Sequence, residues 1–433
     1  MALHREKLVA APDGTINNGL NIYKPKRSKQ ATPPPFSPAP KGRSNTEVIQ
    51  KDYAPIVAND VIRDNKVWGV PLMMDTLALF YDRSKISPPP KTWNDVADLA
   101  AKFTQRNDKT VTRSAMALGE TDSIAHWEDA LSILMLQNGT EMIDPQAKIA
   151  TFNISKTGVT PPGTLALDYY TSFARPDKET YTWNSSLGPS LDAMKAGKTM
   201  MALGYLSDDA RLGLTKTGRI GLAPLPQVDP TKPQTYGRYL AATVTKQAAK
   251  PKAAWNFVSL LANQDIADQY ARDLGVASAR LDVAKTQKLS PAQQPFIDQV
   301  GLAANWQKQE VGVADNAMKE AISLMLKNNE KPQVALDVAS KEYTSFLQTP
   351  TGIFTDPDVL SLWQSAEDAT NYQPVINDFL VQHKDIKLIR VSRHTTARYE
   401  WEVLNAMAAR EGPDILLLPN DAIPRFAPTL RAF

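Results

Sequence analysis

Residues 359–420 alternate between strand-like and helix-like segments, and this alternation constrains the fold of the 433-residue chain more than any other feature. Short apolar runs with β-branched residues lie at 359–363, 386–392 and 414–420, and apolar residues at helical spacing lie between them at 371–383 and 397–410. A β-α-β-α-β order predicts parallel strands joined by right-handed crossovers. The pattern therefore predicts an α/β fold, with one α/β unit at the C-terminal end of the sequence.

The chain from Tyr53 to residue 347 predicts further α/β structure. The stretch VWGVPLMMDTLALFYD (67–82) contains two apolar strand-like runs, and Thr92 with Asp95 three residues later predicts a helix that begins with a capping box. We expect further helices at 126–138, 164–174, 189–197, 250–262, 264–273, 291–302, 313–327 and 332–347, and further strands at 199–206, 219–226 and 239–246. A chain of this length predicts two lobes.

Two segments have the composition of loops. Residues 1–45 combine prolines and cations with few apolar side chains, so they cannot bury enough surface to offset their ordering entropy, and we expect a loop or a mobile tail. A basic nucleic-acid arm and a proline-rich ligand for a recognition domain are the alternatives for this segment. TPTGIFTDPD (349–358) is typical of a linker.

Composition excludes several classes of protein. The net charge of +3 gives no reason to expect a nucleic acid or another polyanion as partner. The absence of cysteine excludes disulfides, thiolate metal sites and a lipid-modified cysteine anchor. The sequence contains no apolar run of about 18 residues that would span a membrane, and MALHREKLVAAPDG lacks the apolar segment of a secretory signal.

The sequence contains no common catalytic motif. Its four histidines lack the HxxxH spacing of a zinc site, and neither a GxSxG nor a phosphate-binding glycine motif is present. We therefore predict a protein that is not an enzyme and that needs no metal and no cofactor. A glycoside hydrolase remains the enzymatic alternative, because two acidic residues that are distant in sequence can converge in the fold.

Six stretches together resemble the extracellular solute-binding proteins of ABC importers, in particular the sugar- and oligosaccharide-binding family that includes maltose-binding proteins. These stretches are WGVPLMMDTLALFYD, PPKTWNDVADLA, GKTMMALGY, IGLAPLP, AAWNFVSLLANQDIADQY and REGPDILLLPND. The resemblance implies a two-lobed α/β fold of the periplasmic-binding-protein type (type II). It also implies capture of a mono- or oligosaccharide between the lobes by hinge closure, delivery to ABC permease subunits, an extracytoplasmic location and a monomer.

The order of these stretches departs from the family, in which the counterpart of 359–433 comes first. We therefore interpret the chain as circularly permuted. Lobe one is expected from 46–78, 243–303 and 359–433, lobe two from 82–237 and 307–348, and 349–358 joins the family's original ends. Hinges are expected near 78–81, 238–242 and 304–306. The alternative is a fragment of a tandem array, in which 359–433 begins a second copy.

The candidate ligand-binding residues combine aromatic side chains, which stack on sugar faces, with polar ones, which bind hydroxyl groups. They are Asp75, Trp127, Trp183, Tyr205, Gly237, Arg238, Tyr239, Trp306, Trp363, Glu367, Asn420 and Asp421. Asn420 and Asp421 follow a strand, at the edge of the sheet where open α/β folds bind ligands. Gly237 would let the backbone approach a ligand closely. Trp68, Trp93, Trp255 and Trp401 are interpreted as packing residues.

Each candidate has a structural alternative. Asp75 could be a turn residue at a strand end, Asn420 and Asp421 could cap a helix, and the tryptophans could belong to a core. Two further functions also remain open for the whole chain. It could bind a non-sugar solute such as a polyamine, a metal chelate or an anion, or it could be a scaffold that binds only other proteins.

Overall fold

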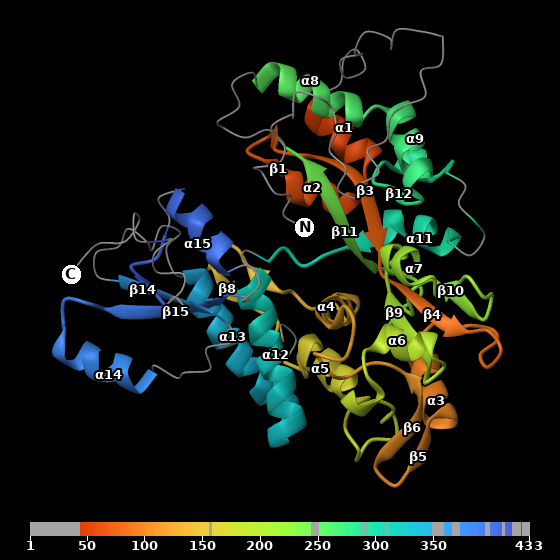
Figure 1. Ribbon diagram of the computed structural model, residues 1–433, viewed down its shortest axis with the longest axis horizontal. Helices are drawn as coiled ribbons and strands as arrows, with labels where there is room; N and C mark the ends of the chain where they lie inside the picture. The colour runs from red at the N-terminus through yellow and green to blue at the C-terminus, as the bar shows by residue number, and fades with distance from the viewer. Residues whose placement is uncertain are drawn as a thin grey trace.

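The computed structural model describes residues 44–155, 158–243, 251–287, 290, 293–308, 311–348, 359–365, 373–394, 399–408, 412–417 and 426. These residues form two α/β lobes and a smaller C-terminal α/β unit (Figure 1). Residues 1–43 of the predicted segment 1–45 lie outside the described residues, and so does the whole of the predicted linker 349–358. The mixture of helices and strands confirms the predicted α/β class.

Lobe one is built on a four-stranded sheet with the order β12-β3-β11-β13. Its strands are β3 (Val70–Thr76), β11 (Thr235–Ala242), β12 (Ala277–Ser278) and β13 (Ala303–Ala304), with a small hairpin of β1 (Ile62–Arg63) and β2 (Lys66–Val67). Its helices are α1 (Asn45–Asp52), α2 (Pro55–Val61), α8 (Pro251–Leu261), α9 (Gln264–Leu274), α10 (Leu281–Ala284), α11 (Gln294–Asp298) and the short η3 (Val300–Leu302). Met74 of β3 and Val57 of α2 are buried together in the core of this lobe.

Helices α1 and α2 were not predicted, although the sequence carries a signal for the first of them. Ser44 accepts a hydrogen bond from the backbone N–H of Glu47, and the Glu47 carboxylate accepts one from the backbone N–H of Ser44 at 2.7 Å. This reciprocal capping box satisfies two N–H groups that a helix N-terminus otherwise leaves without partners. Regular structure therefore begins at Asn45, before the predicted start at Tyr53.

Lobe two is built on a five-stranded mixed sheet with the order β10-β4-β9-β6-β5. Its strands are β4 (Ala78–Asp82), β5 (Gln105–Asn107), β6 (Thr110–Met116), β9 (Thr199–Gly204) and β10 (Ile220–Ala223), with a hairpin of β7 (Ile143–Asp144) and β8 (Ile149–Ala150). Its helices are α3 (Trp93–Phe103), α4 (Trp127–Gln137), α5 (Pro162–Ser172), η2 (Ser185–Leu187), α6 (Ser190–Lys195), α7 (Leu206–Leu212), α12 (Val311–Asn328) and α13 (Pro332–Gln348). The predicted capping box of Thr92 and Asp95 is confirmed at the start of α3.

Within its described residues, the chain passes between the lobes three times. The first crossing is a single residue, Leu77, between β3 and β4, and its N–H donates to the Tyr236 carbonyl at 2.9 Å. The second crossing lies before Thr235, because all of β11 pairs within lobe one, so the hinge predicted at 238–242 is wrong. The third crossing follows β13, which agrees with the prediction at 304–306.

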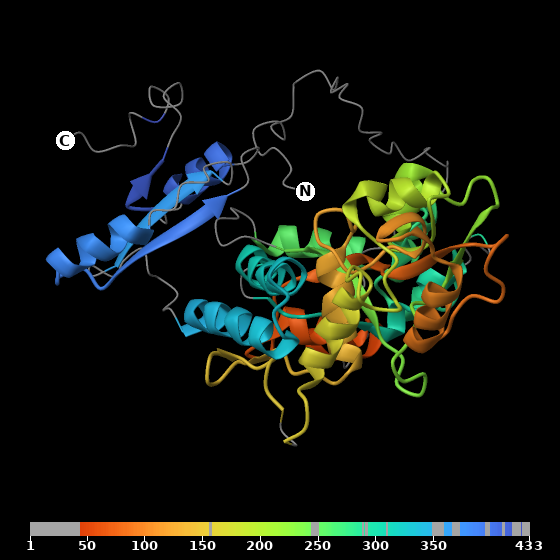
Figure 2. The same ribbon diagram turned by 90° about the horizontal axis from the view of Figure 1, so that it is seen from below.

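The C-terminal unit has a parallel sheet of its own, with the order β15-β14-β16. Its elements are β14 (Val359–Ser365), α14 (Gln373–Gln382), β15 (Leu388–His394), α15 (Tyr399–Ala408) and β16 (Ile415–Leu416), which confirms the predicted β-α-β-α-β order. Trp363, Tyr399, Val403 and Phe426 form a separate small core. Figure 2 shows this unit to one side of both lobes.

The expected pairing of residues 359–433 with the sheet of lobe one is therefore absent among the described strands. Strand β11 pairs with β3 and β13, whereas β16 pairs with β14 alone. The described strands of the unit pair with one another, and Trp363, Tyr399, Val403 and Phe426 are buried together, although Val375, Val381 and Leu388 stay exposed. The structure does not show the circular permutation.

Candidate functional site

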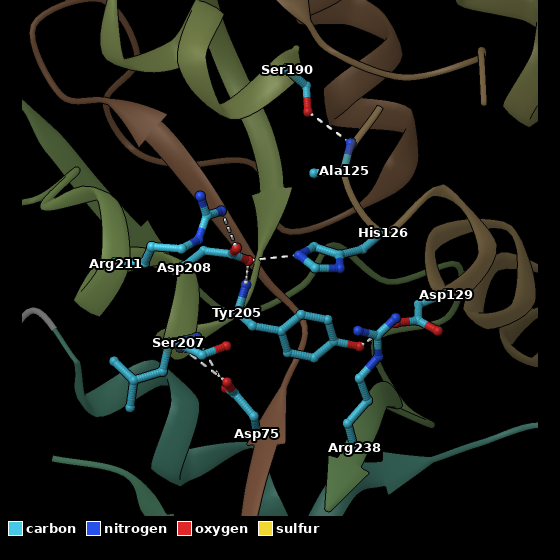
Figure 3. A network of polar contacts seen from close by, with 11 residues as sticks. Asp75, Ala125, His126, Asp129, Ser190, Tyr205, Ser207, Asp208, Arg211 and Arg238 are labelled. Atoms are coloured by element: carbon cyan, nitrogen blue, oxygen red, sulfur yellow. Dashed lines mark hydrogen bonds and ion pairs between the residues drawn. The ribbon is translucent and has the colours of Figure 1, made fainter. Parts of the chain in front are cut away.

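A network of polar side chains joins the two lobes where β3 and β11 reach the hinge (Figure 3). Asp75 of β3 and Arg238 of β11 are cross-strand partners, so their side chains lie on the same face of the lobe-one sheet. Both side chains bind residues of lobe two. The network thus lies between the lobes, where two-lobed proteins commonly hold small molecules.

The Asp75 carboxylate caps a helix of the other lobe. Its Oδ1 accepts the backbone N–H of Leu206, and its Oδ2 accepts the backbone N–H of Ser207, each at 3.0 Å. These two residues begin α7, whose first N–H groups have no partner within the helix. Burial raises the pKa of Asp75, while the hydrogen bonds from Ser207 and Leu206 act against that rise.

Tyr205 lies at the centre of the network, directly before α7. Its hydroxyl donates to Oδ2 of Asp129 at 2.6 Å, and Arg238 contacts the same oxygen at 2.5 Å. The guanidinium of Arg238 also lies over the Tyr205 ring, 4.8 Å from its centroid. Asp129 is 4% exposed and Arg238 is 45% exposed, so the carboxylate is enclosed while the guanidinium reaches solvent.

Burial raises the pKa of Asp129, although the charge of Arg238 and the Tyr205 hydroxyl favour the ionised carboxylate. Burial also opposes the charge of Arg238, but Tyr205 and Asp129 outweigh it and raise the pKa of the guanidinium. Arg238 therefore remains a cation. Its fork of five N–H donors is only partly directed at Asp129, which leaves donors on the exposed side.

A second carboxylate fixes the other side of the Tyr205 ring. Oδ2 of Asp208 contacts Nε2 of His126 at 2.6 Å and accepts the Tyr205 N–H at 2.9 Å, while Oδ1 accepts from Arg211 at 3.0 Å. The His126 ring packs edge-on against the Tyr205 ring, with 4.7 Å between the centroids. Burial opposes ionisation of Asp208, but the hydrogen bond and charge of His126 lower its pKa to about 2.

Of the predicted site residues that the structure describes, Asp75, Tyr205 and Arg238 meet in this network. Trp127 is next to His126 and is partly buried against both core clusters of lobe two. Tyr239 points to the opposite face of the sheet, where its hydroxyl donates to Asp60 at 2.6 Å. Trp363 lies in the C-terminal unit. Glu367, Asn420 and Asp421 lie outside the described residues.

Three further predictions are corrected by the structure. Trp183 is fully buried in lobe two and donates from its indole N–H to Ser123 at 3.0 Å, so its ring offers no face to a ligand here. Trp306 is 5% exposed and packs edge-on against Phe152 and Tyr343. A Cβ on Gly237 would come within 2.7 Å of the Ala303 Cβ, so close packing, rather than access to a ligand, explains the glycine.

The four tryptophans interpreted as packing residues differ in their exposure to solvent. Trp93 is buried at 3% exposure, as predicted, and Trp255 is partly buried. Trp68 is 52% exposed, so the prediction that it is a packing residue is wrong. The side chain of Trp401 lies outside the described residues. The strand pattern of 66–82 did not indicate that Trp68 precedes β3 and lies at the surface of lobe one.

The sequence analysis missed four residues of the network: His126, Asp129, Asp208 and Arg211. A partial signal exists for Asp208, because an acidic residue three positions after Tyr205 is typical of the first turn of a helix. No signal connects Asp129 with Arg238, since the two are 109 positions apart in the sequence. Among the described residues, no helix is long and apolar enough to cross a membrane, and no group of acidic or histidine side chains could hold a metal ion.

Several solved structures that share the fold bear the names of sugar-binding proteins. A cyclic α-maltosyl-1,6-maltose-binding protein from Arthrobacter globiformis is 18% identical, with a TM-score of 0.56, over 69% of this chain and 77% of that one. The maltose-binding periplasmic protein of Listeria monocytogenes, solved with maltose, is 18% identical, with a TM-score of 0.56, over 70% and 78%. A cyclo/maltodextrin-binding protein, solved with maltotetraose, is 17% identical, with a TM-score of 0.55, over 70% and 76%.

These likenesses confirm the predicted periplasmic-binding-protein fold. Comparison with curated protein sequences gave no match. The family model described as bacterial extracellular solute-binding protein matches residues 39–295, which is more than half of the chain. This match agrees with the predictions of a binding protein rather than an enzyme, and of a place of action outside the cytoplasm. The chain belongs to the bacterial extracellular solute-binding protein family.

Proposed function

We propose that this protein captures a carbohydrate between its two lobes and delivers it to the membrane subunits of an ABC importer. The observation that carries the proposal is the interlobe network, which places the Tyr205 ring and the partly exposed Arg238 beside the carboxylates of Asp75, Asp129 and Asp208. The Tyr205 ring is only 2% exposed and is covered by Arg238 and His126, so the group of the network that can meet a sugar is Arg238, whose exposed N–H donors suit hydroxyl oxygens.

The internal hydrogen bonds of the network suggest which groups meet the ligand. Both oxygens of Asp75 and of Asp208 already accept from protein donors. The bonds of Asp75 hold the start of α7 against β3, whereas those of Asp208 lie within the first turns of α7. Arg238 retains exposed N–H donors, so we assign it the contact with sugar oxygens. Tyr205 and Asp129 orient the guanidinium, and we treat them as positioning residues.

Ligand capture in this proposal requires that the sugar binds the closed arrangement of the lobes more tightly than the open one. Because both lobes contribute to the network, a ligand that contacts Arg238 and α7 together favours closure. The closed form is then the one that the permease recognises. The proposed partners are a mono- or oligosaccharide and the permease subunits, and the protein acts as a monomer.

Calorimetric titration of the full chain with glucose, maltose, maltotriose and mannobiose tests this function. Spermidine, inorganic phosphate and a neutral amino acid serve as probes for the alternative solute classes. We expect saturable binding of at least one sugar, and at least tenfold weaker binding by Arg238→Met. The proposal would be overturned if spermidine or phosphate bound and none of the sugars did. It would also be overturned if Arg238→Met left the affinity for the sugar unchanged.

Three further measurements test the rival functions and the oligomeric state. Analysis of the sugars after prolonged incubation with the protein tests for a glycoside hydrolase, and we expect no product. Sedimentation with and without the sugar tests the monomer. A carbohydrate at 100 times its Kd should also raise the unfolding free energy by about 2.7 kcal/mol, which a scaffold without a small-molecule site would not show.

A further inference from the structure

A second polar site lies at the hinge, on the face of the lobe-one sheet opposite the interlobe network. A hollow of about 550 Å³ that is wide open to solvent is lined by Gln50, Ala58, Asn59, Ile62, Asn305 and Gln307. This volume is within the range of small-molecule sites in proteins, about 300–1,000 Å³. Four of the six lining side chains are amides and none is charged.

Asp60 orients two of these amides. Its Oδ2 accepts from Nδ2 of Asn305 at 2.8 Å, and its Oδ1 accepts from Nε2 of Gln307 at 2.8 Å. A carboxylate only accepts hydrogen bonds, so each amide must turn its NH₂ group toward Asp60. The carbonyl oxygens of Asn305 and Gln307 are thereby directed away from Asp60.

Tyr239 completes the shell around Asp60. Its hydroxyl donates to Oδ2 at 2.6 Å, and burial together with this bond raises the pKa of Tyr239, so the phenol stays a donor at all physiological pH values. Both oxygens of Asp60 are thus occupied by protein donors. Asp60 positions the amides and does not itself contact a ligand in the hollow.

We propose that this amide-lined hollow is a second ligand site, which binds a small uncharged polyhydroxy compound. Amide side chains offer both donors and acceptors without net charge, so hydroxyl groups can be satisfied at every wall. Ala58 and Ile62 supply an apolar strip for the C–H groups of such a compound. The lining residues offer no counter-ion to a charged ligand.

The site joins the two lobes, so its occupancy acts on the hinge. Asn305 and Gln307 flank Trp306, whose ring is buried in the core of lobe two against Tyr343. Asp60 and Asn59 belong to α2 of lobe one. A ligand that bridges these walls restrains the third crossing, and by linkage the interlobe ligand must change the affinity of the hollow by the same factor.

Titration of the ¹⁵N-labelled full chain tests the site, with amide chemical shifts as readout. The neutral probes are glucose and myo-inositol, and glucuronate and glucosamine are the charged counterparts of glucose. We expect shifts at Asn59 and Asn305 with the neutral probes, and at least tenfold weaker binding of the charged ones. Absence of shifts at these residues with both neutral probes would overturn the site.

Two variants block the hollow from different walls, Asn59→Trp on α2 and Gln50→Trp on α1, and both positions are exposed. Each should weaken binding in the hollow at least tenfold. Gln264→Trp, at an exposed position of α9 away from the hollow, is the matched control and should change the affinity less than twofold. Equal affinities in all three variants would show that the hollow holds only solvent.

Failure of this site is distinguishable from failure of the interlobe site. Arg238→Met should abolish the calorimetric signal of the transported sugar and leave the shifts at Asn305 in place. Asn59→Trp should abolish the shifts at Asn305 and leave the calorimetric signal of the transported sugar in place. Loss of both signals in Asn59→Trp alone would mean that the hollow and the interlobe network are one site, which contradicts the inference.

Discussion

Arg238 and Tyr239 are neighbours on β11, and each binds a carboxylate on a different face of the sheet. Arg238 reaches Asp129 of lobe two at 2.5 Å, whereas the Tyr239 hydroxyl reaches Asp60 of lobe one at 2.6 Å. Successive side chains of a strand point to opposite faces, so one short segment carries both contacts. The strand next to the hinge is therefore fixed from two sides.

Substitution of Arg238 should destabilise the protein as well as weaken sugar binding. In Arg238→Met the buried carboxylate of Asp129 keeps the Tyr205 hydroxyl but loses its cation. We expect a loss of about 1–3 kcal/mol in the unfolding free energy, measured by urea denaturation. Arg272→Met removes an exposed ion pair with Asp268 on α9 and should cost no more than about 0.5 kcal/mol. Equal losses in the two variants would contradict the role of Asp129.

Asp75→Asn should loosen the contact between the lobes. An asparagine has one acceptor oxygen, so one of the backbone N–H groups of Leu206 and Ser207 would face an NH₂ group. We expect a loss of about 1–3 kcal/mol in stability and a larger radius of gyration in X-ray scattering of the ligand-free protein.

The control for that variant is Asp229→Asn, because Asp229 accepts only from Thr231 within an exposed loop. It should change stability by no more than about 0.5 kcal/mol and leave the scattering curve unchanged. If Asp75→Asn behaved like this control, the hydrogen bonds from α7 would have no part in holding the lobes together.

Gly237→Ala should be destabilising through packing. The added Cβ would lie 2.7 Å from the Ala303 Cβ, which is closer than real Cβ contacts allow, and a tight 3.1 Å from Cδ1 of Ile56. We expect a loss of about 1–3 kcal/mol by thermal or urea unfolding. Gly301→Ala is the matched control, since its Cβ would meet Leu281 at an ordinary 3.7 Å, and a comparable loss there would refute the packing explanation.

Stability should fall in acid through Asp208. Its pKa in the folded protein is about 2, below the ordinary value of 3.8, because His126 and other donors stabilise the ionised form. A carboxylate with a lowered pKa contributes stability that is present above the unfolded-state pKa and is lost as the pH falls toward the folded-state pKa. We expect wild type to lose on the order of 2 kcal/mol more than Asp208→Asn between pH 4 and pH 2. Parallel pH profiles from urea unfolding would contradict this contribution.

Several elements could be predicted from a few adjacent residues. Thr92 and Asp95 specify the start of α3 because their capping bonds lie within one turn, and Ser44 with Glu47 carries the same information for α1. Trp183 shows the limit of such reasoning. Its polar neighbours in the sequence indicated exposure, but elements distant in sequence cover its ring completely.

The sequence by itself determined many of the α/β elements, the cap of α3 and the β-α-β-α-β order of residues 359–416, because these depend on periodicity and on bonds between near neighbours. Only the tertiary structure decided that β16 pairs with β14 and not with β11, and that Asp129 meets Arg238. Strand edges and charged side chains accept many partners of similar energy, so which pair forms depends on how the lobes pack.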